Sequence, residues 1–171
     1  MKKKVSRSLM MGALATCVVL SPFASQNSAL STPVQASTIV FNETFDGGLT
    51  GWSYTLASVG TVNGNRYIHL QAGQNSSIVP GSGIISDVGF IEKNISGVTN
   101  GKRYRVTFKA SGVGNVSIDS SNYINVNTGS VNMANARTYT YEGVASKNVI
   151  NVFALVYGST MGIDDIKIEA L

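Results

Sequence analysis

The sequence has 171 residues, of which 43% are hydrophobic and only 13% are charged. Its 13 Lys and Arg residues exceed its 9 Asp and Glu residues, but four of the cations lie within the first seven residues, and the rest of the chain is electrically balanced. Because no cluster of Lys and Arg remains there, we expect neither nucleic-acid binding nor attraction to an anionic membrane surface.

The first 36 residues are predicted to form a secretory signal peptide. A basic head, "MKKK", precedes an apolar run from Leu9 to Leu20, which is shorter than the about 20 residues of a membrane-spanning helix. The sequence "VQA" is a small-residue cleavage site that ends at Ala36. We expect a protein that is secreted or held at the cell surface, without membrane insertion, and one domain over residues 37–171. Cys17, the only cysteine, lies in the leader, so no disulfide stabilises the domain.

Beyond the leader, short runs of alternating polar and apolar residues predict β-strands. The clearest run is "RYRVTFKA", in which Tyr104, Val106 and Phe108 should face the core and the cations at 103, 105 and 109 the opposite side. Turn sequences such as "VNGN", "TNGK" and "VNTG" separate the runs. No window shows a convincing ten-residue amphipathic helix, so we expect an all-β sandwich.

Three segments, taken together, resemble a known family. The sequences "NETFDGGLTGW" (42–52), "GKRYRVTFKAS" (101–111) and "MGIDDIKIEAL" (161–171) are similar to the opening, a middle strand and the closing strand of carbohydrate-binding modules of the galactose-binding-like kind. The resemblance covers nearly all of residues 38–171. It implies a jelly-roll β-sandwich of two antiparallel sheets, with Trp52 packed in its core, and non-catalytic binding of carbohydrate. Gly162 stands where the family often has an aromatic residue.

The resemblance also suggests a structural calcium site. The first and last strands of such a jelly roll are neighbours, so Asp46 and Asp164 could share an ion, with Gly47 and Gly48 allowing backbone oxygens to approach it. The alternative is that Asp46 begins a turn and that Asp164 is an ordinary surface charge.

An enzyme is not expected. Outside the leader the chain has one histidine, His69, and no cysteine. The adjacent Asp164 and Asp165 would point to opposite faces of a strand, which does not suit a two-carboxylate glycosidase. The sequence has no Gly-x-Ser-x-Gly motif, metal-binding histidine pair or phosphate-binding loop.

Sugar binding requires less: an aromatic ring on which a pyranose stacks, and polar groups for its hydroxyls. The candidate platforms are Tyr54, Tyr67 and Tyr123, and the candidate polar partners are His69, Gln71, Arg103, Arg105 and Asn122. The leading hypothesis is therefore a secreted, non-catalytic module that binds a polysaccharide or a cell-surface glycan. The alternative is an exported adhesion, envelope or toxin-associated interaction domain that uses the jelly-roll scaffold without sugar specificity.

Overall fold

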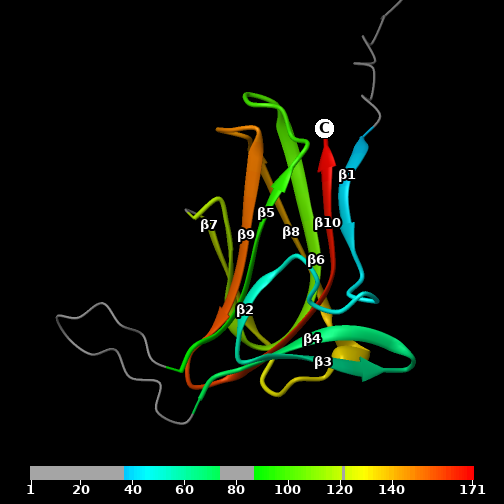
Figure 1. Ribbon diagram of the computed structural model, residues 1–171, viewed down its shortest axis with the longest axis vertical. Helices are drawn as coiled ribbons and strands as arrows, with labels where there is room; N and C mark the ends of the chain where they lie inside the picture. Colours follow the sequence, from blue (N-terminus) through cyan, green and yellow to red (C-terminus); the bar gives the residue numbers. More distant parts are fainter. Residues whose placement is uncertain (1–36, 74–86, 121) are drawn as a thin grey trace, which may run out of the picture. The chain divides into compact units, whose positions relative to one another are not determined.

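The computed structural model describes residues 37–73, 87–120 and 122–171 (Figure 1). The predicted signal peptide, residues 1–36, lies outside the described residues. The elements in chain order are β1 (Thr38–Glu43), β2 (Ser53–Thr55), β3 (Ala57–Val62), β4 (Asn65–Gln71), β5 (Gly89–Ser96), β6 (Arg103–Ile118), β7 (Asn122–Asn127), a 3-10 helix (Met133–Asn135), β8 (Arg137–Val144), β9 (Val149–Val156) and β10 (Thr160–Ala170). The all-β prediction is confirmed. Among the described helices, none is long and apolar enough to cross a membrane.

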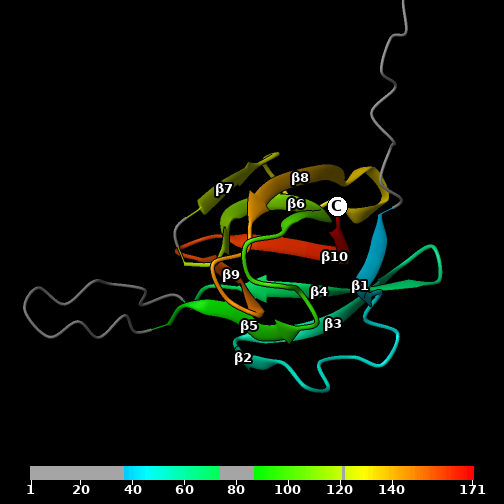
Figure 2. The same ribbon diagram turned by 90° about the horizontal axis from the view of Figure 1, so that it is seen from above.

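The strands form two antiparallel sheets. In sheet A, β10 pairs with β1 and β4 along one edge and with the first part of β6 along the other; β3 extends the sheet beyond β4, and β8 extends it beyond β6. In sheet B the order is β2, β5, β9, the second part of β6, and β7. The first and last strands, β1 and β10, lie side by side, as a jelly roll requires (Figures 1 and 2).

The 16-residue strand β6 belongs to both sheets. It passes from one to the other near Gly112, which has φ of +107°, a conformation that favours glycine. A Cβ at this position would lie 2.3 Å from the carbonyl oxygen of Thr160, so the neighbouring strand also leaves no space for a side chain. The crossing therefore needs a glycine at this point.

Alternation along β6 places the core as predicted. Tyr104, Val106 and Phe108 are buried between the sheets, whereas Arg103 and Lys109 are exposed. The same core receives Ile68 and Leu70 from β4 in sheet A, and apolar residues of β5 and β9 in sheet B. One face of each sheet is thus apolar, and the opposite outer faces can carry function.

The opening stretch is fixed to the core through Trp52. Its ring is buried, 6% exposed, and packs against Phe45 at a centroid distance of 5.4 Å. The indole N–H donates to Glu43 Oε2 at 3.2 Å, while Glu43 Oε1 accepts from the backbone N–H of Phe45 at 3.0 Å. The ammonium group of Lys93 lies 5.2 Å from the Trp52 ring centroid. The predicted core role of Trp52 is confirmed.

Candidate functional site

The sugar-contact residues that the sequence suggested do not form one site. Tyr67 and His69 of β4 lie on the outer face of sheet A, because they alternate with the buried Ile68 and Leu70. Tyr123 of β7 is 67% exposed and lies on the outer face of sheet B. These positions belong to opposite sides of the sandwich.

The remaining candidates lie elsewhere again. Arg103 and Arg105 are ion-paired with Glu142 of β8, at 2.9 and 2.6 Å, on the outer face of sheet A. The hydrogen bond from Arg105 and the two guanidinium charges hold the pKa of Glu142 below its usual value.

Tyr54 is aligned with the buried Ile91, so it lies on the core side of sheet B, at the exposed edge formed by β2. These two arginines are partners of Glu142, and Tyr54 is separate from Tyr123.

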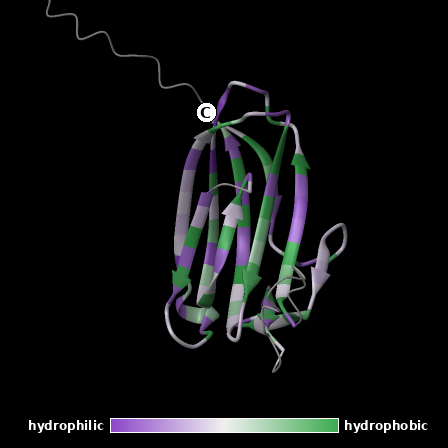
Figure 3. Ribbon diagram, turned by 90° about the vertical axis from the view of Figure 1, so that its left-hand side faces the viewer, coloured by the Kyte–Doolittle hydropathy of each residue, from purple (hydrophilic) through white to green (hydrophobic). Residues whose placement is uncertain are grey.

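The outer face of sheet B is rich in amide and aromatic side chains, and we call it the amide face. Its residues alternate with more deeply buried residues on β5, β6, β7 and β9. Figure 3 shows hydrophilic and hydrophobic residues alternating along strands of the domain. The members of the amide face are Phe90, Glu92, Asn94, Asn115, Ser117, Tyr123, Asn125, Asn151 and Phe153. They come from four adjacent strands and so form one continuous surface.

Asn151 is the centre of a hydrogen-bond network on this face. Its side-chain Nδ2 donates to Glu92 Oε1 at 2.8 Å and to Asn94 Oδ1 at 3.0 Å. Its backbone N–H donates to Asp119 Oδ1 at 3.0 Å. Because the bonds link β9 to β5 and to the end of β6, the amide and the carboxylate are held in fixed orientations. Pre-oriented polar groups of this kind bind sugar hydroxyls with a small loss of side-chain entropy.

Asp119 links the amide face to the core beneath it, at the place where Asn151 lies. Its Oδ2 accepts a hydrogen bond of 2.9 Å from the hydroxyl of the buried Tyr104. Burial, together with the Asp119 carboxylate, raises the pKa of Tyr104, so this hydroxyl keeps its proton and acts as a donor. Beside Asp119 lies an open hollow of about 350 Å³, whose lining includes Asn94, Asn151 and Lys147. The polar network therefore borders a space that a ligand could enter.

Aromatic rings and an unpaired hydroxyl occupy the middle of the amide face. The rings of Phe90 and Phe153 lie 5.6 Å apart at 44°. Ser117 is aligned with Phe153 on one side and with Tyr123 on the other. It is 1% exposed, and its Oγ has no hydrogen-bond partner among the described residues. A buried hydroxyl without a partner costs stability, which is a frequent feature of binding sites.

The two predicted calcium ligands lie close enough to influence each other. The pKa of Asp164 is raised to about 6, chiefly by burial and also by the carboxylates of Asp165 and Asp46. The Asp165 backbone N–H and the Lys109 ammonium act in the opposite direction and lower it. Asp46 accepts from Thr44 Oγ1 at 2.9 Å, and its carbonyl oxygen accepts from Arg66 Nη1 at 2.6 Å. A half-buried carboxylate beside a second one fits the chemistry of a hard cation. Within the described ranges, however, no group of three or more His, Cys, Asp or Glu residues could hold a metal.

Sequence reasoning missed most of the amide face. The sequences "GFIEKNIS" (89–96) and "NVINVFALVYG" (148–158) are among the alternating runs that predict strands, but Phe90, Asn151 and Phe153 were not selected as ligand-binding residues. A signal was present: Phe90, Glu92 and Asn94 alternate along the first run, and Asn151 and Phe153 are two positions apart in the second. Their pairing could not be read from the sequence, because β5 and β9 are more than fifty residues apart.

Comparisons with known proteins agree with this description. A model of the family described as "Carbohydrate binding domain" matches residues 37–157. None of the characterised proteins compared by sequence matches the chain.

Solved structures share the fold at low sequence identity. One is the CBM22-1–GH10 part of endo-1,4-β-D-xylanase 10B from Clostridium thermocellum, complexed with xylohexaose, with 15% identity and a TM-score of 0.51 over 78% of this chain. This chain spans only 28% of that one. Another is the CBM22-2 xylan-binding domain of Xyn10C from Paenibacillus barcinonensis, with 13% identity and a TM-score of 0.51, covering 77% of this chain and 99% of that domain. Since the family model covers most of the described residues, the protein belongs to the carbohydrate binding domain family.

Proposed function

We propose that this protein is a secreted, non-catalytic module that binds carbohydrate on the amide face of sheet B. Membership of the family supports carbohydrate as the ligand class. The observation that carries the assignment of the face is the network around Asn151, which holds an amide and the Glu92 carboxylate beside the Phe90 and Phe153 rings. The N-terminal leader in the sequence supports export.

Each group on the face has a role in this proposal. A pyranose ring would rest its apolar C–H face on Phe153, with Phe90 and Tyr123 as further contacts. The amides of Asn94, Asn115 and Asn125 would donate to and accept from its hydroxyls. A polysaccharide or a cell-surface glycan with exposed pyranose faces satisfies both requirements. The face carries a carboxylate, Glu92, and we therefore expect neutral sugars to bind better than acidic ones.

The carboxylates near the face support a non-catalytic role. A glycosidase needs an acid and a second carboxylate about 5 to 10 Å apart, both free to act. Glu92 accepts from Asn151, while Asp119 is engaged by Tyr104 and by the backbone of Asn151. Both groups are thus used to orient their neighbours.

We also propose that Asp46 and Asp164 hold a structural calcium ion. When bound, the ion would neutralise two carboxylates of the opening stretch and the last strand; backbone carbonyls and water would complete its six to eight oxygen ligands. Its role would be stabilisation, at a place remote from the amide face.

The test is binding of the protein to xylan, cellulose and galactan by affinity gel electrophoresis, with calorimetry on soluble oligosaccharides. We expect Phe153→Ala and Asn151→Ala each to weaken binding at least about tenfold, the equivalent of about 1.4 kcal/mol. The matched control is Thr138→Ala, an exposed position of β8 on sheet A, which should bind like the wild type.

Two results would contradict the proposal. Equal affinity of Phe153→Ala and the wild type would remove the amide face from the site. Failure of a broad glycan array to detect any ligand would favour the alternative, an exported adhesion, envelope or toxin-associated domain that uses this scaffold without sugar specificity.

A further inference from the structure

The outer face of sheet A carries a second aromatic platform, centred on Tyr67. Tyr67 of β4 is aligned with Gly60 of β3. A Cβ built on Gly60 would lie 2.3 Å from Tyr67 Cζ, and 2.6 and 2.7 Å from its bonded neighbours Cε1 and Oη. The Cβ position is closer to Cζ than to either bonded neighbour, and it is almost equally far from the two neighbours. An approach at the ring edge would bring it closer to a neighbour than to Cζ, so the Cβ position lies above the ring plane. The ring is therefore laid flat on the backbone of β3, and its other face points away from the sheet.

A row of uncharged polar side chains continues from this ring along β4. His69 and Gln71 follow Tyr67 at every second position and share its face, and Ser58 is aligned with His69 on β3. Tyr67 and Gln71 are separated by about 13 Å, at about 3.3 Å per residue. The row offers an imidazole, a hydroxyl and an amide, each able to donate and accept hydrogen bonds.

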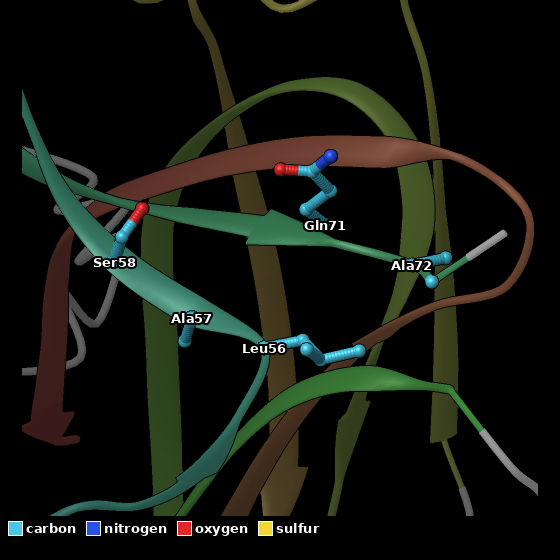
Figure 4. A pocket seen from close by; sticks show the side chains of 6 residues that line it. Leu56, Ala57, Ser58, Gln71 and Ala72 are labelled. Atoms are coloured by element: carbon cyan, nitrogen blue, oxygen red, sulfur yellow. The ribbon is translucent and has the colours of Figure 1, made fainter.

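The row ends in a hollow. Ser58 and Gln71 line an open cavity of about 380 Å³ together with Leu56, Ala57, Ala72 and Gly73. Figure 4 shows the Ser58 and Gln71 side chains on the same side of their two strands. The volume lies in the range of small-molecule sites, about 300–1,000 Å³. The lining residues carry no formal charge.

Met133 of the 3-10 helix packs on β10, the strand next to β4. Gly162 of β10 is aligned with His69, and a Cβ there would lie 2.5 Å from Met133 Sδ. Met133 thus covers the position where related modules often carry an aromatic residue. His69 lies between the Tyr67 ring along β4 and the Met133 thioether one strand away, and Gln71 continues the polar row to the hollow.

We infer that this strip, made of Tyr67, His69, Gln71 and Ser58, is a second carbohydrate site, which binds a short segment of an uncharged pyranose oligosaccharide. Tyr67 stacks on one sugar ring, the polar row contacts hydroxyls, and the hollow beside Gln71 takes a further ring. Because this strip lies on sheet A and the amide face on sheet B, the two sites point away from each other. One molecule can then hold two glycan chains at once.

The experiment is an NMR titration of the isotopically labelled protein with xylohexaose, cellohexaose and β-1,4-galactotriose as probes. We expect at least one probe to shift the backbone amide signals of residues 57–61 and 66–71. These shifts should persist in Phe153→Ala and disappear in Tyr67→Ala. Tyr67→Phe, which keeps the ring, should retain them.

Gly60→Ala provides a variant that leaves the tyrosine in place. The added Cβ would meet the ring at Cζ and displace it, so affinity at the strip should fall about tenfold. The matched control is Thr61→Ala, an exposed neighbour on the opposite side of β3, which should bind as the wild type does. Thermal melts confirm that each variant is folded.

The presence of two glycan sites on one molecule can be tested separately, by cross-linking of beads. Beads coated with the polysaccharide that binds should aggregate with the wild type, and either Phe153→Ala or Tyr67→Ala should abolish aggregation while binding to the beads remains.

The outcomes separate this inference from the proposed function. If every probe shifts only signals of the amide face, the second site is overturned and the proposed function stands. If probes shift the strip and not the amide face, the strip stands and the site assigned on sheet B is wrong. If no probe shifts any signal, both sites are overturned for these sugars.

Discussion

At the scale of single residues, Asp164 has the most unusual carboxylate chemistry. Burial raises its pKa to about 6, whereas an exposed aspartate has a pKa of about 3.9. The folded state therefore binds this proton more tightly than the unfolded state, and the contribution to stability falls as the pH rises from about 4 to about 6. With calcium removed by a chelator, we expect Asp164→Asn to be more stable than the wild type above pH 6 and no more stable below pH 4. Thermal melts in EDTA from pH 4 to pH 8 measure this difference.

A carboxylate on the same strand serves as the control. Glu169 is paired with Lys167 at 3.3 Å, so Glu169→Gln should lose a favourable interaction and show no gain of stability at high pH. A constant difference between Asp164→Asn and the wild type at every pH would show that burial of the charge is not the cause.

Ser117 is the second residue with an identifiable cost. Its Oγ is buried without a partner among the described residues, and an unsatisfied buried hydroxyl costs about 1–3 kcal/mol. We expect Ser117→Ala to raise the free energy of unfolding by about 1 kcal/mol. Urea denaturation measures this effect. A loss of stability would show that the hydroxyl has a partner in solution.

At the scale of elements, the opening stretch is held by Glu43. This carboxylate accepts from both Trp52 Nε1 and the Phe45 backbone N–H. Glu43→Ala leaves two part-buried donors unpaired, so we expect a loss of about 2 kcal/mol or more in the free energy of unfolding. Trp52 is the only tryptophan, so its fluorescence reports on this place alone and should shift to longer wavelength in the folded variant.

The matched control for Glu43 is Asp46→Ala in EDTA. Asp46 lies in the same stretch, but within the part of the chain that the structure describes its side chain bonds only to the exposed Thr44. Its replacement should leave the Trp52 emission unchanged. A red shift of equal size in both variants would mean that the whole turn, rather than Glu43, orients the indole.

At the scale of the whole molecule, the two sheets were predictable and their junction was not. The period-2 pattern of residues 103–110 correctly predicted which residues face the core, because alternation is a local property of a strand. The continuation of β6 into sheet B depends on Gly112 and on its contact with Thr160, residues that are distant in sequence. The pattern therefore identified a strand but not its passage between sheets.

The candidate sites show the same limit. Individual tyrosines could be chosen from the sequence, but Phe90 and Phe153 form a pair only because β5 and β9 are adjacent. Arg103 and Arg105 were plausible sugar donors until the pairing of β6 with β8 placed Glu142 between them. Tyr67 remains a candidate sugar platform because its ring lies flat on Gly60 of β3. This contact depends on the register of β3 with β4, which the sequence alone does not give.

The ends of the domain meet where β1 runs beside β10, and without a disulfide this junction depends on hydrogen bonds and packing. Asp46 follows β1, and Asp164 lies within β10 at a register shift of that strand. A cation bound by both would connect the opening stretch to the last strand. It would also remove the cost of ionising the half-buried Asp164, which is the reason to expect a measurable effect on global stability.

We therefore predict that calcium raises the melting temperature at pH 7.5. An ion that binds only the folded state adds RT ln(1 + [L]/Kd), about 2.7 kcal/mol at a free concentration 100 times Kd, which corresponds to a shift on the order of 10 °C for a domain of this size. The melt is recorded with calcium, with magnesium and with EDTA. Asp164→Asn and Asp46→Asn should each abolish the calcium shift, and magnesium, which prefers a tight octahedral shell, should have little effect. A shift that survives both substitutions would place the ion elsewhere. If calcium has no effect on the wild type, the two aspartates are a turn residue and a destabilising half-buried charge, and the junction of β1 with β10 is held by its hydrogen bonds and packing alone.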